Sequence, residues 1–294
     1  MEDTQIVNVE FEEKEFERPL YNQLDKGTTY VWSPGQIFEK LIGIDSAIFL
    51  ENPYLWRRMG YCNPLAGVLL EDYNFGYIWK VIKKRKPLPD FRLNLFIQAK
   101  RPNYKYKTPP KKVRSYISGE CYKFEITNHQ QKALEKLHIN LRNRVLILYA
   151  APCFSTSAEL YRHTCNGTII DSTSFVKASS MKGHSSCIYN TTIGIGCSVP
   201  EELQKINIYE EINLFIEENY GREANSSLQY LWTSIFDTLK DGDLINETTA
   251  YFINEVDELE NYINRYDFED NEMKYYILIK KFCEFYNLDW FVLG

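Results

Sequence analysis

The chain has 294 residues, a mass of 34.7 kDa and a formal net charge of −6. Its hydrophobic content of 44% and aromatic content of 15% are sufficient for a packed core and exclude a disordered chain. No apolar stretch reaches the roughly 18 residues of a membrane span and the N-terminus is acidic, so we expect a cytoplasmic protein with no membrane partner.

The first third of the chain contains few clear elements. Residues 1–32 form an acidic segment, in which apolar residues alternate between positions 7 and 11 and predict an edge strand. A helix is predicted to start at Ser33–Pro34 and to carry Glu39. Asp45 lies near the start of a second β-like run, and an insertion is expected at about 52–90.

The tripeptide that ends at Lys100 has the most specific pattern. An apolar run over residues 93–97 predicts a strand, and Gln98, Ala99 and Lys100 follow it directly. Side chains alternate along a strand, so Gln98 and Lys100 are expected on one face. Burying two such polar groups on an apolar strand is costly, which favours a site over a structural role.

Beyond this tripeptide the pattern predicts a mixed sheet flanked by helices. Strands are predicted at 121–126 and 145–152, with a helix from Asn128 to 137 between them. Residues 201–294 show three or four amphipathic helices, and we expect them to form an acidic all-α subdomain next to a core at 33–200.

Together these features resemble the PD-(D/E)XK superfamily, the restriction-endonuclease-like nucleases, in the variant whose motif is Gln-x-Lys. The resemblance implies an α/β fold with a mixed β-sheet core. It also implies Asp45 as the acid of the site, although 53 residues separate Asp45 from Gln98 where the family usually has a short hairpin. Asp72 is a secondary candidate because it would shorten the insertion.

The resemblance implies an endonuclease that needs Mg²⁺ or Mn²⁺. Asp45, Gln98, the Ala99 carbonyl and Glu39 would supply oxygen ligands, which hard cations prefer. Lys100 would orient and help to deprotonate the attacking water. Gln130, on the next helix, would contact bound water or the nucleic-acid backbone. By analogy alone, restriction or antiviral defence is the expected setting.

The charges are divided unevenly along the chain. Residues 80–114 contain thirteen basic residues and one acid, which indicates a polyanionic partner. We therefore expect a nucleic-acid-binding surface, with DNA as the first substrate to test. The basic residues assigned to it are Lys83, Lys84, Arg85, Lys86, Arg101, Lys105, Lys107, Lys111, Lys112 and Arg114.

Two alternatives remain open at this point. Residues 201–294 hold 21 acids and 7 bases, so their helices are expected to face a protein partner and not nucleic acid. The first alternative is a catalytically inactive nucleic-acid-binding protein on the same fold. The second is a partner-recruiting protein whose basic segment only balances the acidic helices. The sequence is compatible with a homo-oligomer.

Overall fold

The computed structural model describes most of the chain outside one long segment. The described residues are 6–27, 31–32, 93–219, 228–241, 244, 246–264 and 272–293. Glu39, Asp45, Asp72 and the basic run 83–86 therefore lie outside the described residues, as do the helix expected from residue 34 and the insertion.

The described elements are a mixture of strands and helices. In chain order they are β1 (Ile6–Asn8), α1 (Glu13–Gly27), β2 (Val31–Trp32), β3 (Leu93–Ala99), β4 (Tyr104–Tyr106), η2 (Lys111–Val113), β5 (Cys121–Glu125), α5 (Asn128–Leu141), η3 (Arg142–Arg144), β6 (Val145–Pro152), α6 (Ser157–Asn166), β7 (Thr173–Lys177), η4 (Ala178–Met181), β8 (Ser186–Tyr189), β9 (Gly194–Gly196), β10 (Glu201–Leu203), α7 (Ile208–Glu218), α8 (Leu228–Leu239), α9 (Glu247–Asn264), α10 (Glu272–Tyr286) and β11 (Asp289–Leu293).

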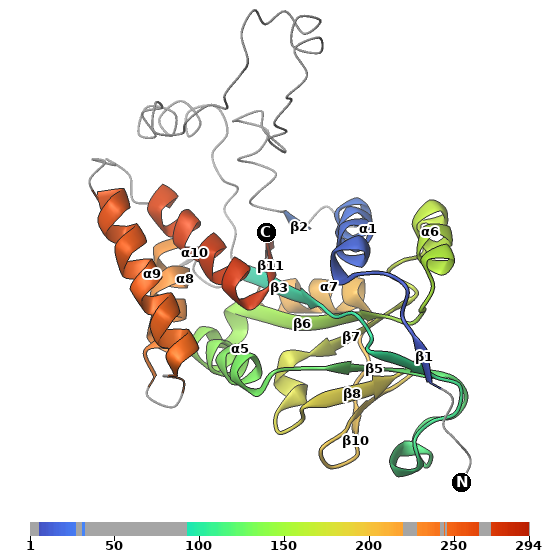
Figure 1. The fold of residues 1–294 in the computed structure, drawn as a ribbon. Coiled ribbons are helices and arrows are strands. Elements are labelled where there is room, and N and C mark those ends of the chain that lie inside the picture. The colour runs from blue at the N-terminus through green and yellow to red at the C-terminus, as the bar shows by residue number, and fades with distance from the viewer. Residues whose placement is uncertain are drawn as a thin grey trace, which may run out of the picture.

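A five-stranded sheet with the order β2-β11-β3-β6-β7 forms the centre of the molecule (Figure 1). Its two central strands, β3 and β6, are parallel, and the other neighbours are antiparallel. Every residue of β3 and β6 is buried. Both faces of the sheet are covered, which explains why these strands read as nearly continuous apolar runs.

Helices cover the two faces of this sheet with separate cores. On one face, α1 and α7 contribute Phe16, Leu20 and Ile212 to a core with Leu95 of β3. The opposite face carries Phe96 and packs against α5, α8 and α10. The C-terminal helices therefore share their core with the central strands.

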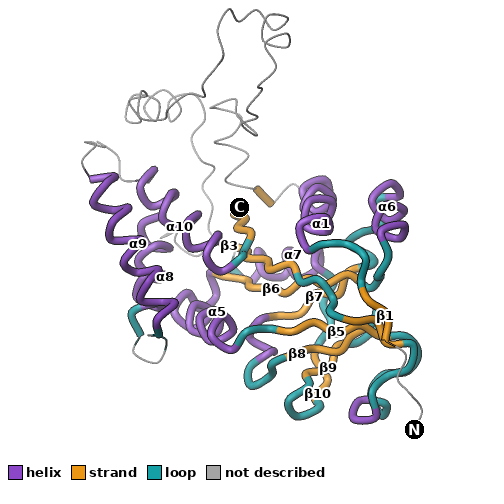
Figure 2. The backbone as a smooth tube through the Cα atoms, viewed as in Figure 1, coloured by secondary structure: helices purple, strands orange, loops and turns teal. Residues whose placement is uncertain are grey.

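A second, antiparallel sheet of six strands has the order β1-β4-β5-β8-β9-β10 (Figure 2). Its residues Phe124 and Tyr189 join the same core as Tyr149 of β6, with ring centroids of Phe124 and Tyr149 5.9 Å apart. Two of its strands, β4 and β5, together with α5 form the connection from β3 to β6, which lies parallel to β3.

The mixed α/β class expected from the sequence is confirmed, and β6 has the predicted bounds 145–152. The expectation of an all-α segment at 201–294 is wrong, because β10 and β11 lie within it. β11 pairs with β3 in the middle of the five-stranded sheet, with Trp290 opposite Phe96. Among the described helices, none is long and apolar enough to cross a bilayer.

Candidate active site at the end of strand β3

Gln98 and Lys100 lie where the parallel pair β3 and β6 ends. Gln98 is fully buried, and the Lys100 amide continues the ladder by donating to the Ala150 carbonyl at 2.8 Å. Both residues follow Phe96 at intervals of two, whereas Ile97 and Ala99 belong to the core on the opposite face. Binding sites of open α/β sheets are common at the carboxyl ends of parallel strands.

The carboxamide of Gln98 has a defined orientation. Its Nε2 atom donates to the Tyr286 carbonyl at 2.7 Å and approaches the Asn287 carbonyl at 3.4 Å. Carbonyl oxygens only accept hydrogen bonds, so the NH₂ group must lie on this side and Oε1 on the other. Oε1 is buried and has no hydrogen-bond partner among the described residues. The site therefore contains a buried oxygen acceptor whose hydrogen-bonding capacity is not used by the described residues.

Lys100 lies in a partly buried position against an aromatic ring. Its Nζ atom is 5.7 Å from the ring centroid of Tyr149, whose hydroxyl donates to Gln131 at 2.7 Å. Desolvation lowers the pKa of Lys100, and the nearby charge of Glu13 opposes this shift. The aromatic face partly compensates the cation for lost water. At a given pH, a larger fraction of Lys100 than of an exposed lysine is therefore the neutral amine, which is the form that can accept a proton.

The start of α5 reaches the same place. Gln130 donates from Nε2 to the Tyr286 carbonyl, which thus accepts from two glutamines. The ring of His129 stacks on the Tyr286 ring, with centroids 5.7 Å apart, and its Nε2 lies 2.8 Å from the Thr249 hydroxyl. Gln130, expected to contact bound water or nucleic acid, is thus placed beside Gln98 but uses its amide internally.

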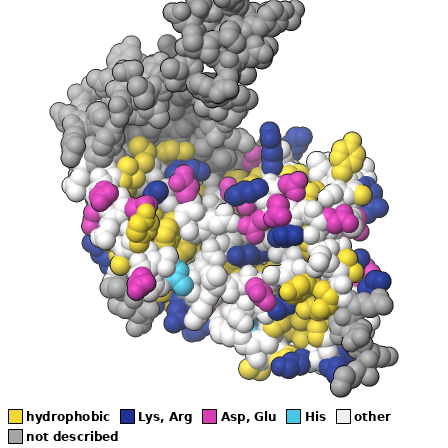
Figure 3. All heavy atoms as spheres, viewed as in Figure 1, with side chains coloured by type: hydrophobic (Ala, Val, Ile, Leu, Met, Phe, Trp, Pro, Cys, Tyr) yellow, Lys and Arg dark blue, Asp and Glu magenta, His cyan; other side chains and the backbone are white. Residues whose placement is uncertain are grey.

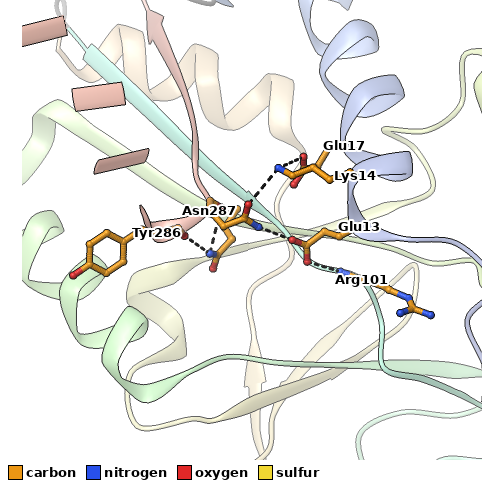
Figure 4. A network of polar contacts seen from close by, with 7 residues as sticks. Glu13, Lys14, Glu17, Arg101, Tyr286 and Asn287 are labelled. Carbon is orange, nitrogen blue, oxygen red and sulfur yellow. Dashed lines mark hydrogen bonds and ion pairs between the residues drawn. The ribbon is translucent and has the colours of Figure 1, made fainter. Parts of the chain in front are cut away.

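Helix α1 supplies carboxylates on the other side of the strand end (Figure 4). Glu13 accepts from the backbone amide of Arg101 at 3.2 Å and from the side-chain amide of Asn287 at 2.6 Å. Lys14 donates to Asn287 at 3.2 Å and forms an ion pair with Glu17 at 2.7 Å. This network ties α1 to the end of β3 and to the turn before β11.

Two further acids near α1 prefer the protonated form more than usual. Burial raises the pKa of Glu17 against the opposing effect of Lys14, and burial likewise raises the pKa of Asp289, the first residue of β11. Asp289 lies opposite Ile97 in the register, so it belongs to the α1 side of the sheet and not to the Gln98 side.

A divalent cation would need more ligands than the described residues bring together. No group of three or more His, Cys, Asp and Glu side chains that could hold a metal is found within them. The Gln98 oxygen, which has no partner within the described residues, is an atom of the kind that Mg²⁺ prefers. The residues present therefore fit a cation only if segment 33–92, which contains Glu39, Asp45 and Asp72, adds carboxylates.

Of the described residues assigned to the nucleic-acid-binding surface, some form contacts within the protein and others are exposed. Arg101 donates to the Val9 carbonyl at 2.7 Å, and Lys105 forms an ion pair with Glu120 at 2.8 Å. These contacts give both residues a structural role, and their part in binding remains a prediction.

The segment between β4 and β5 carries the exposed basic side chains. Lys107, Lys111, Lys112 and Arg114 are exposed, and the Arg114 Nε atom donates to the Pro109 carbonyl at 2.8 Å. Figure 3 shows Lys and Arg side chains at this end of the molecule, at the lower right, whereas acidic and basic side chains are mixed over the middle of the same face. The exposed cations thus lie on the connection between β4 and β5, two neighbouring strands of the six-stranded sheet.

Comparisons with protein-family models, curated proteins and solved structures found no match. The site is thus defined by its geometry alone. Sequence reasoning missed Glu13, although Phe16, Leu20 and Leu24 have the spacing of a helix face beside it. It also missed Asn287 and Tyr286, which come from the far end of the chain and carry no local signal.

Proposed function

We propose that the chain is a metal-dependent endonuclease that hydrolyses phosphodiester bonds of nucleic acid. The observation that carries the proposal is the pair Gln98 and Lys100. The two share one face at the carboxyl end of a central parallel strand. Gln98 has a buried oxygen without a partner among the described residues, and Lys100 has a desolvated amine. A merely structural glutamine would be expected to satisfy both ends of its carboxamide.

The roles of the residues follow from their chemistry. A bound Mg²⁺ or Mn²⁺ would supply Lewis-acid stabilisation of charge on the scissile phosphate. Gln98 offers Oε1 as a fixed ligand because its NH₂ group is held by Tyr286. Lys100, with its lowered pKa, takes or shares the proton of the attacking water and, when protonated, offsets phosphate charge. Asp45, with Glu39 and the Ala99 carbonyl, would complete the ligand set.

The exposed cations between β4 and β5 support a polyanionic substrate. Lys107, Lys111 and Lys112 are exposed, and Tyr104 and Tyr116 beside them have exposed fractions of 38% and 44%. Exposed rings next to cations can stack on unpaired bases while the cations bind phosphate. Tyr106 is buried under this segment and has a structural role.

The test is cleavage of plasmid, single-stranded DNA and RNA with Mg²⁺ or Mn²⁺ and then with EDTA. We expect cleavage that EDTA abolishes. Asp45→Ala should remove it, and Asp72→Ala should leave it intact. If only Asp72→Ala removes it, the assignment of the acid is wrong. If the wild type binds nucleic acid but cleaves none of these substrates with either metal, the protein is a binding module.

A further inference from the structure

Three segments that are distant in the sequence, α1, β3 and α5, meet at the turn between α10 and β11. The Tyr286 carbonyl accepts from Gln98 of β3 and from Gln130 of α5. The Asn287 carbonyl is the second acceptor near the Gln98 amide, at 3.4 Å. The position of the Gln98 carboxamide therefore depends on where this turn lies.

Helix α1 binds this turn through the side chain of Asn287. This residue has a φ of +50°, in the left-handed region that Asn and Gly tolerate best. Its side chain accepts from Lys14 and donates to Glu13 (Figure 4). The second oxygen of Glu13 accepts from the Arg101 amide at 3.2 Å.

The backbone amides of Lys100 and of the next residue, Arg101, are both hydrogen-bonded. The Lys100 amide donates to Ala150, and the Arg101 amide donates to Glu13. Glu13 is thus in contact with the strand end that carries Lys100 and, through Asn287, with the turn that holds Gln98. One carboxylate connects the supports of both residues.

We propose that Glu13 and Asn287 are positioning residues that set the relative placement of Gln98 and Lys100. This inference rests on the proposed nuclease function. Neither residue has to touch the substrate, since each acts through the backbone next to a reacting group. A misplacement of about 1 Å far from the chemistry can cost roughly a hundredfold in rate.

The test changes the side chain of Asn287 to residues that can keep its left-handed backbone conformation. Asn287→Gly keeps the left-handed conformation and removes both side-chain hydrogen bonds. In the wild type the Asn287 amide nitrogen lies 2.6 Å from the Glu13 carboxylate. Asn287→Asp replaces this amide by a second carboxylate, which Glu13 repels. The double variant Glu13→Gln with Asn287→Asp reverses the direction of that hydrogen bond and still offers an acceptor to Arg101. Asn207→Gly, at the cap of α7, is the matched control.

Two readouts are measured on the full chain for every variant. In steady-state cleavage, we expect Asn287→Gly to lower kcat about tenfold or more, with KM within about threefold of the wild type. The kcat of Asn287→Asp should be lower still, and the double variant should recover most of the loss. In amide hydrogen exchange, the Arg101 amide should exchange faster in both single variants and slow again in the double variant. The control should match the wild type in both assays.

The outcomes separate this inference from the function on which it rests. Wild-type kcat in Asn287→Gly, or no recovery in the double variant at an unchanged Tm, would overturn the positioning role. If the wild type cleaves nothing, the proposed function fails and the exchange data decide alone. Faster Arg101 exchange that the double variant reverses then still supports the connection, and unchanged exchange refutes it.

Discussion

The orientation of the Gln98 carboxamide makes a specific prediction for Gln98→Glu. In a nuclease that binds a cation, a carboxylate at this position would be expected to improve metal binding. In this structure the replacement removes a donor and brings a carboxylate oxygen to within about 2.7 Å of the Tyr286 carbonyl in a fully buried position. We therefore expect the variant to be destabilised.

The magnitude can be worked out from these contacts. Loss of a buried hydrogen bond that leaves a polar group poorly satisfied costs about 1–3 kcal/mol, and a buried carboxylate adds to this. We expect a loss of about 3 kcal/mol at pH 8, which corresponds to a fall in Tm of roughly 6–12 °C for a chain of this size. Gln98→Met, of similar volume and without charge, should cost only about 1 kcal/mol.

The effect should depend on pH in a defined direction. Burial and the carbonyl oxygens raise the pKa of the introduced carboxyl in the folded state above its value in the unfolded state. The folded variant then binds the proton more tightly, so its stability falls as pH rises, by up to about 1.4 kcal/mol per pH unit. At low pH the protonated group can donate to the Tyr286 carbonyl, and the gap to the wild type should narrow.

Thermal and urea unfolding followed by circular dichroism between pH 5 and pH 8 measures this gap. A Gln98→Glu variant as stable as the wild type at pH 8 would refute the reasoning. In that case the Gln98 amide would not be held by Tyr286, and Oε1 would not be the group that is free for a ligand.

Three other predictions concern stability. Gly196→Ala should cost about 1–3 kcal/mol in urea unfolding, because its Cβ would lie 2.6 Å from the His184 ring; an unchanged midpoint would contradict this contact. Deleting residues 289–294 removes β11, whose four buried side chains from Trp290 to Leu293 contribute about 2 kcal/mol or more each. The truncated chain should therefore show no cooperative melting transition, and cooperative melting would refute the role of β11. Asp289→Asn should gain stability relative to the wild type as pH rises above 3.8, because burial raises the pKa of Asp289; a difference that does not change with pH would argue against this burial.

The central strands could be predicted from the sequence because their signals are local. β6 is a long apolar run, and Gln98 and Lys100 stand out because they interrupt the apolar pattern at the end of β3. Both were therefore found without any knowledge of their neighbours. The existence of α10, at 272–286, was likewise clear from its periodicity.

The surroundings of the site could not be predicted, because they depend on contacts between distant parts of the chain. Asn287 and Glu13 are 274 positions apart, and neither has a neighbour in sequence that reveals the other. β11 is a short apolar run directly after a helix, and its pairing with β2 and β3 shows that it is a strand. Local periodicity cannot report such pairing.

The most direct test of the central claim is the single-turnover cleavage rate of Lys100→Ala at saturating Mg²⁺, beside its affinity for the same nucleic acid. Lys182→Ala, an exposed lysine after η4, is the matched control. For Lys100→Ala we predict that the rate falls by about a hundredfold or more and that the Kd stays within about threefold of the wild type. The control should have wild-type values. Cleavage by Lys100→Ala at the wild-type rate would contradict a catalytic role for the end of β3.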